Sequence, residues 1–199
     1  MKTRILIITQ IFLLVVGLPL FGQITQALAP ATITVKGTST MHDWEMKTST
    51  IKGQAVFVME DRLAAVKNLS ITLPAETLKS GKDGMDKNAY KALKTSQHKN
   101  ITFDLTTIKS IAGSGNSSEI SAEGRLQIAG VTKVVPVKAT CTADSKGGFR
   151  CQGERSFKMS DFGVEPPSFM LGTVKTGDDI TIVFDISFPG NTTISNSTK

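Results

Sequence analysis

The sequence predicts an all-β protein of about eight antiparallel strands, folded as a sandwich or as a closed barrel. Segments in which apolar and polar residues alternate recur along most of the chain, which is typical of strands with one buried face. Glycine, asparagine, aspartate and serine gather between these segments, as they do in turns. With 199 residues, of which 40% are hydrophobic and 20% charged, the chain suits one globular domain with a substantial core.

The first strand begins with the alternation at Ile33–Val35. Gly37 interrupts this pattern, which predicts a bulge or a sharp bend. After three hydroxyl residues, His42 and an aspartate lead directly to Trp44, the only tryptophan. The segment is either a strand end with a core tryptophan and a solvated His–Asp pair, or a place where packing and polar chemistry meet.

The later strands follow the same alternation or short apolar runs, separated by turn signals. They are expected at Lys52–Asp61, Val66–Pro74, Ile101–Thr106, Glu119–Ile128, Val135–Cys141, Phe149–Cys151, Phe157–Met159 and Ile180–Phe188.

One amphipathic helix is predicted within Ser80–Gln97, between two strands. Its apolar residues recur at helical spacing. They are Met85, Ala89, Ala92 and Leu93, with Tyr90 beside them. Asp83 or Asp86 is expected to cap its start. Its apolar side is expected to face the barrel interior, where the helix either plugs one end or forms a lid over a cavity.

The N-terminus has the pattern of a secretory signal. Lys2 and Arg4 precede the largely apolar run Ile5–Phe21, and small residues follow soon after. Cleavage is expected after Gly22 or after Ala29, and a permanent N-terminal anchor is the alternative. The protein is therefore expected to be exported, to the periplasm or outside the cell. The predicted segments are a signal peptide at 1–22, a barrel domain at 30–189 and a disordered polar tail at 190–199.

Only two cysteines occur, Cys141 and Cys151, and they flank the turn-rich stretch Asp144–Gly148. A chain that folds back within this stretch sets the two cysteines opposite each other on neighbouring strands. Export would place them where disulfides persist. A cross-strand bridge is predicted, and two free buried thiols are the alternative.

Several functional classes find little support. The histidines are only His42 and His98, too few to expect a transition-metal site, and no cofactor is expected. His42 and Asp43 are adjacent, so on a strand they point to opposite faces, which is poor geometry for a catalytic relay. The net charge is +6, partly from the signal, with lysines spread along the chain. Neither an enzyme nor a nucleic-acid-binding protein is expected.

The strands offer apolar surface, and ten phenylalanines dominate the aromatic residues. A barrel of this size can hold one small ligand. The same side chains would equally fill a core, and composition does not separate a filled barrel from a hollow one.

Five segments, taken in order, resemble the YceI-like family of exported lipocalin-like barrels associated with polyisoprenoid binding. They are G-T-S-T-M-H-D-W with K-G-Q-A-V-F, then M-D-K-N-A-Y-K-A-L-K-T-S-Q-H-K-N-I-T-F, L-Q-I-A-G-V-T-K-V-V-P-V, S-D-F-G-V and G-D-D-I-T-I-V-F. The resemblance covers roughly Ala31 to Phe188. It departs at the first strand, where ligand-binding members usually have a phenylalanine-rich stretch leading to a histidine. The resemblance therefore leaves three expectations for the ligand: an isoprenoid, another long-chain lipid, or none.

The resemblance implies an extended, lipocalin-like, eight-stranded antiparallel β-barrel that holds its lipid in the lumen. It implies transport, storage or sequestration rather than catalysis, with transient membrane contact. The alternative is a structural or interaction barrel with a filled core and no ligand. His42, Asp43 and Lys87 are candidates for a polar mouth. The lumen candidates are Val35, His42, Trp44, Leu69, Ile71, Met85, Tyr90, Leu93, Ile101, Phe103, Leu126, Val137, Phe157, Phe162 and Phe184.

Overall fold

The computed structural model describes residues 22–28, 30–59, 63–169 and 172–190. The predicted signal, apart from Gly22, and the predicted tail, apart from Gly190, lie outside the described residues. Within the described part, no helix is long and apolar enough to cross a bilayer.

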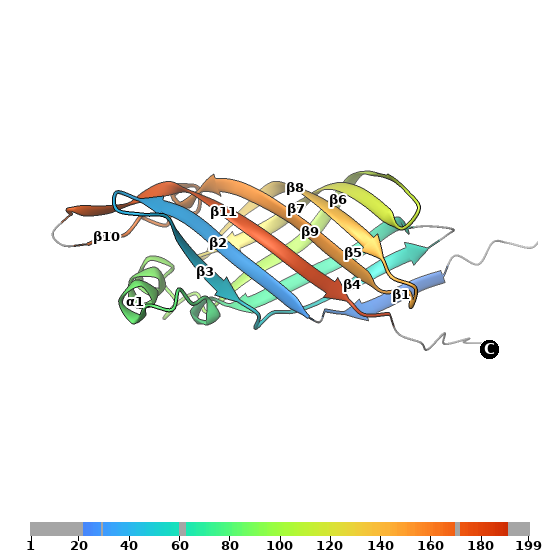
Figure 1. The fold of residues 1–199 in the computed structure, drawn as a ribbon, viewed down its shortest axis with the longest axis horizontal. Coiled ribbons are helices and arrows are strands. Elements are labelled where there is room, and N and C mark those ends of the chain that lie inside the picture. Colours follow the sequence, from blue (N-terminus) through green and yellow to red (C-terminus); the bar gives the residue numbers. More distant parts are fainter. Residues whose placement is uncertain (1–21, 29, 60–62, 170–171, 191–199) are drawn as a thin grey trace, which may run out of the picture.

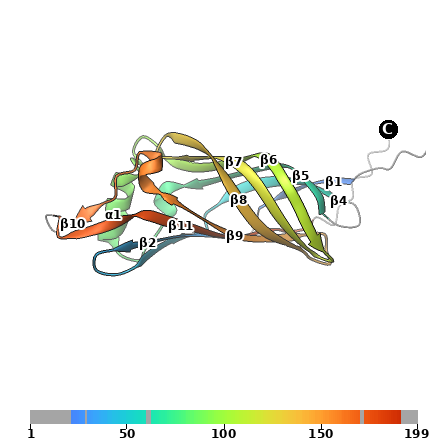
Figure 2. The ribbon, with the colours of Figure 1, turned by 90° about the horizontal axis from the view of Figure 1, so that it is seen from above.

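The described chain forms a long, curled antiparallel sheet with a short α-helix at one end (Figures 1 and 2). Two short 3₁₀ helices, η1 and η2, accompany it. The strands are β1 (Gly22–Ala27), β2 (Ala31–Ser39), β3 (Trp44–Thr48), β4 (Lys52–Met59), β5 (Leu63–Pro74), β6 (Asn100–Ser114), β7 (Ser117–Ile128), β8 (Val131–Ala143), β9 (Phe149–Lys158), β10 (Ser168–Phe169) and β11 (Val174–Phe188); the helices are η1 (Ala75–Thr77), α1 (Asp83–Ala92) and η2 (Met159–Phe162).

The sheet closes into a barrel of eight long strands, as the sequence predicts. In the ladder order β1-β4-β5-β6-β7-β8-β9-β11-β2-β3, the two ends are joined by the chain itself, because β1 runs on into β2 and β3 into β4. Ala27 pairs with Gln54, and Ile33 pairs with Thr48. Ile33 lies six residues after Ala27, and Thr48 lies six residues before Gln54, so the register is the same in both ladders. The strands β1–β2 and β3–β4 are therefore two long bent strands, and β10 is a short addition beside β11.

The inward and outward faces follow directly from the alternation in sequence. On β7 the even-numbered residues from Ser118 to Ile128 are buried, while the odd-numbered ones are exposed or half-buried. The turn from β7 to β8 places Ala129 and Gly130 at φ values of 49° and 84°. Two positive φ values in sequence are typical of the tight hairpin turns that match the twist of the strands.

Two features of the first strands differ from the predictions. Gly37 is not a bulge: it pairs regularly with Trp44 and Ile180, and the irregularity lies opposite, in β11 between Thr176 and Ile180. The sheet also begins before the predicted boundary at residue 30, because all six residues of β1 pair with β4. Local alternation does not reveal β1, because β1 is defined by its pairing with β4, a strand some 30 residues later in the chain.

Helix α1 is shorter than the predicted segment and is not capped as predicted. Its N-cap residue is Lys82, and no side chain caps it. Asp86 instead lies buried within the first turns and accepts hydrogen bonds from the Ser80 backbone N–H (2.8 Å) and hydroxyl (2.7 Å). Lys79 Nζ lies 3.6 Å from the same carboxylate. Asp86 thus ties the helix to the segment before it.

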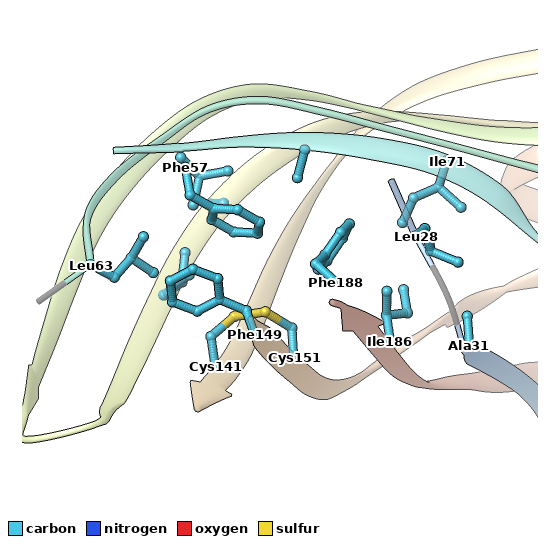
Figure 3. Close-up of a cluster of buried hydrophobic side chains, with 14 residues drawn as sticks. Leu28, Ala31, Phe57, Leu63, Ile71, Cys141, Phe149, Cys151, Ile186 and Phe188 are labelled. Carbon is cyan, nitrogen blue, oxygen red and sulfur yellow. A yellow bond between two sulfur atoms is a disulfide. The ribbon is translucent and has the colours of Figure 1, made fainter. Parts of the chain in front are cut away.

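The end of the barrel opposite α1 is filled by aromatic rings (Figure 3). The Phe57 ring stacks on Phe149, with centroids 4.4 Å apart, and meets Phe188 edge-on at 5.2 Å. Beside them, Cys141 and Cys151 pair across β8 and β9 and form the predicted disulfide. These side chains close this end of the interior.

Candidate functional site

The barrel contains an inner chamber of about 170 Å³. Its wall is formed by inward-facing side chains of the strands, among them Ile71, Phe103 and Phe184. Apart from Thr102 and Arg155, the described residues that line it are all apolar or disulfide-bonded cysteines. The phenylalanine cluster bounds it at the closed end, since Phe57 and Phe188 belong to its wall.

An outer chamber of about 410 Å³ lies between the barrel end and α1. Trp44 on β3, Met85 on α1 and Phe162 in η2 line it, and most of the remaining wall is apolar. Its polar residues include His42 and Lys82, both exposed. This chamber is therefore the end of the interior that meets solvent.

The two chambers adjoin each other, because five residues line both of them, and together they are called the lumen here. These five residues are Val35, Leu78, Ile101, Phe157 and Ile182. The lumen reaches from the phenylalanine cluster to the mouth beside α1, and its walls are mainly apolar, with most of the polar residues in the outer chamber. Such a space can accept a long, apolar chain with a polar end.

Fourteen of the fifteen predicted lumen residues line these chambers. The inner wall includes Leu69, Ile71, Phe103, Leu126, Val137 and Phe184; the outer wall includes His42, Trp44, Met85, Leu93 and Phe162; and Val35, Ile101 and Phe157 belong to both. On α1, Ala89 and Ala92 also line the outer chamber, so the apolar side of the helix faces the interior as predicted.

Tyr90 is the exception and does not line the lumen. Its hydroxyl lies 2.8 Å from the backbone oxygens of Glu76 and Leu78, to which it donates, and the ammonium of Lys79 lies 5.0 Å from the ring centroid. A tyrosine that reaches backbone acceptors outside the cavity satisfies its polar tip there. Tyr90 therefore fastens α1 to η1.

The predicted polar mouth is formed only in part by the predicted residues. His42 lies at the mouth, where its Nδ1 is 3.0 Å from the Asp43 backbone oxygen. Asp43 and Lys87 are exposed but do not line the chamber, and Lys82 does. No group of three or more metal-ligating side chains occurs in the part of the chain that the structure describes.

Arg155 is the cavity residue that the sequence interpretation missed. The odd-numbered residues Phe149, Cys151 and Phe157 of β9 all line one of the chambers or pack in the core beside them. Because side chains alternate along a strand, the same parity directs Arg155 inward. Extending the alternation through the whole of β9 would have identified it.

Fold and lumen together define a lipocalin-like barrel, a class in which an antiparallel β-barrel encloses a small apolar space. More particularly, the chain belongs to the YceI-like family, whose domain model matches residues 23–188. This match begins within β1. A UPF0312 protein of Pseudomonas aeruginosa is 27% identical over 116 residues, which cover 55% of this chain and only 58% of that relative.

Solved structures with low sequence identity share the fold. A polyisoprenoid-binding domain from Saccharophagus degradans has a TM-score of 0.66 at 10% identity, with 86% of this chain and 99% of that chain covered. BcnA of Burkholderia cenocepacia has a TM-score of 0.64 at 17% identity, with 79% and 95% covered. A YceI protein of Campylobacter jejuni has a TM-score of 0.54 at 18% identity, with 70% and 81% covered.

Proposed function

We propose that this protein binds one long-chain lipid, with an isoprenoid as the favoured class, in its lumen for transport, storage or sequestration. The observation that carries the proposal is the pair of adjoining, mainly apolar chambers inside the barrel, with volumes of about 170 and 410 Å³. The likeness of the fold to a polyisoprenoid-binding domain supports an isoprenoid.

The volumes also suggest how long the bound chain is. An apolar cavity of about 150 Å³ holds one benzene-sized molecule. By that measure the inner chamber takes only a short chain end, and the two chambers together take on the order of twenty carbons. A longer chain would extend through the mouth beside α1.

The energetic need for such a carrier is large. Each CH₂ group exposed to water costs about 0.8 kcal/mol relative to an apolar environment. A lipid that leaves a bilayer therefore requires a dry container. Carrying a lipid requires no chemical step, and we propose binding rather than catalysis.

The alternative, a structural barrel with a filled core, is less well supported. Protein cores are close-packed and contain few voids larger than a water molecule. The outer chamber lies within the range of volumes usual for ligand pockets, about 300–1,000 Å³. We therefore favour the ligand-binding function.

We propose that the protein is exported and that its mouth contacts membranes transiently. Met41, in the β2–β3 hairpin turn, lines the outer chamber and is 69% exposed, and the exposed Lys82 lines the same chamber. An exposed methionine can enter a lipid surface while a lysine meets its headgroups.

Because β1 pairs with β4, we also propose that signal cleavage occurs near Gly22 rather than after Ala29. The mass of the mature protein tests the cleavage site.

Binding of geranylgeraniol to delipidated protein tests the proposed function. Trp44, the only tryptophan, lines the outer chamber and serves as the fluorescent probe. Val35→Phe adds volume where the chambers meet and should weaken binding, whereas Val134→Phe makes the same change at a site that is 61% exposed and should not. No binding by the wild type, or equal binding by both variants and the wild type, would contradict the proposal.

A further inference from the structure

Among the residues that the structure describes, Arg155 is the only charged one in the wall of the inner chamber. It lies on β9 two residues before Phe157, and its partner in the β9–β11 ladder is Ile182. Phe157 and Ile182 both line the two chambers. Arg155 therefore lies close to the place where the chambers meet, and it does not line the outer chamber, which contains the mouth at α1.

The barrel wall is incompletely paired beside Arg155. On one side, β9 pairs with β11 along its whole length, Phe149–Lys158. On the other side, the ladder with β8 ends at the pair Thr140 and Gln152. Pro136, further along β8, has no N–H to offer a neighbouring strand. Arg155 thus faces the lumen and yet is exposed to solvent.

The guanidinium of Arg155 has no hydrogen-bond or ion-pair partner among the described residues. Arg150 on the same strand differs, because its Nε donates to Asp185 Oδ1 at 2.8 Å. A cation beside an apolar wall is best suited to bind an anion that also carries an apolar chain, because the chain can pack against the wall. Guanidinium groups bind carboxylate and phosphate oxygens through two parallel hydrogen bonds.

We propose that Arg155 binds the oxyanion headgroup, a carboxylate or a phosphate, of the lipid whose chain occupies the lumen. This inference rests on the proposed function and narrows its ligand to acidic amphiphiles. The headgroup lies at the unpaired stretch of β9, where it keeps contact with water. The chain enters the lumen beside Phe157 and Ile182.

The test compares lipids that differ only in the headgroup. Dodecanoate, dodecyl phosphate and 1-dodecanol are titrated near pH 8 by calorimetry into delipidated wild-type protein, Arg155→Ala and Arg155→Lys. Arg125→Ala is the matched control, because Arg125 lies on the exposed, outward face of β7. A charge-assisted hydrogen bond predicts that at least one of the two acids binds the wild type about tenfold or more tightly than the alcohol.

Arg155→Ala should abolish this preference, while Arg155→Lys keeps part of it and Arg125→Ala keeps all of it. The acid that shows the larger preference identifies the headgroup as carboxylate or phosphate. Equal binding of acids and alcohol to the wild type would overturn the inference and leave the proposed function intact. If Lys82→Ala abolishes the preference for acids and Arg155→Ala does not, the inference is overturned, and the headgroup binds at the mouth beside Lys82. Failure of all three lipids to bind would overturn both proposals.

Discussion

Trp44 lies across the backbone of Gly37, its partner in the β2–β3 ladder, so closely that a Cβ atom on residue 37 would overlap Cζ2 of the indole. The indole Nε1 donates to the Thr38 backbone oxygen at 2.9 Å, which holds the ring in this position. Trp44 forms part of the wall of the outer chamber, and its position there depends on the absence of a side chain at residue 37. The glycine is required by close packing rather than by an unusual backbone conformation.

Gly37→Ala should destabilise the protein by about 1–3 kcal/mol, as overpacking of a well-packed site does. The displaced indole should also change the emission of Trp44. Gly84→Ala is the matched control: its added Cβ meets no atom within 4 Å, and alanine in a helix should stabilise by about 0.5–1 kcal/mol. Urea unfolding followed by fluorescence measures both. A Gly37→Ala variant as stable as the wild type would contradict the packing described for Trp44.

Substitutions in α1 and at its C-cap residue, Leu93, separate a plug from a lid. Leu93 packs against two of the core clusters, and Leu93→Ala should cost about 2 kcal/mol, at the low end for core truncations because the side chain is only half-buried. Met85 faces the outer chamber, so Met85→Gln should weaken lipid retention with a smaller effect on melting.

The control for the helix variants is Lys87→Gln, at an exposed position outside the lumen wall. Thermal melting and lipid retention are measured for all three variants. If the Leu93→Ala and Met85→Gln variants both match the control in both measurements, the helix serves neither purpose.

Asp86→Asn should reduce stability at neutral pH but not in acid. Burial raises the pKa of Asp86, but the two Ser80 hydrogen bonds and Lys79 together outweigh it and hold the pKa below its usual value. A carboxylate with a lowered pKa in the folded state stabilises above its unfolded pKa of about 4, and this contribution is lost as the pH falls through the folded value.

Melting temperatures of the wild type and Asp86→Asn between pH 2 and 8 should therefore differ most above pH 4 and converge below it. Asp83→Asn, in the same turn but exposed, provides the control. A constant difference across the whole pH range would show that the charge of Asp86 contributes nothing.

Loss of the Cys141–Cys151 bridge should cost about 2–3 kcal/mol, since it closes a short loop, with a sequence separation of 10. The double variant Cys141→Ala, Cys151→Ala should unfold at the same denaturant concentration as the reduced wild type. Denatured but unreduced mature protein should show no reactive thiols. Two labelled thiols per chain would mean that the bridge is absent from the protein.

Local sequence pattern was sufficient for most of the strands, the helix and most of the lumen. Alternation fixes which side chains of a strand share a face, so residues such as Ile71 and Leu126 could be placed inside before their partners were known. The disulfide was predictable for a similar reason, because one turn between the two cysteines sets their register.

Local sequence pattern could not predict the features that depend on contacts between segments distant in the chain. Gly37 meets Trp44 only through the register of their hairpin. Tyr90 has helical spacing suited to the lumen, but acceptors on η1 hold its hydroxyl outside. The inward direction of Arg155 follows from parity, whereas its exposure follows from the end of the β8–β9 ladder, which no local pattern indicates.

Native mass spectrometry of the full chain purified from its own host, without detergent or delipidation, tests the central claim most directly. Because the two adjoining chambers of the lumen are mainly apolar, we predict a population of protein that carries one lipid per chain, with a chain of about twenty carbons or longer. Val35→Phe should reduce this population, and Val134→Phe should not. Wild-type protein that repeatedly carries no lipid, and that takes up none when lipid is supplied, would contradict the account.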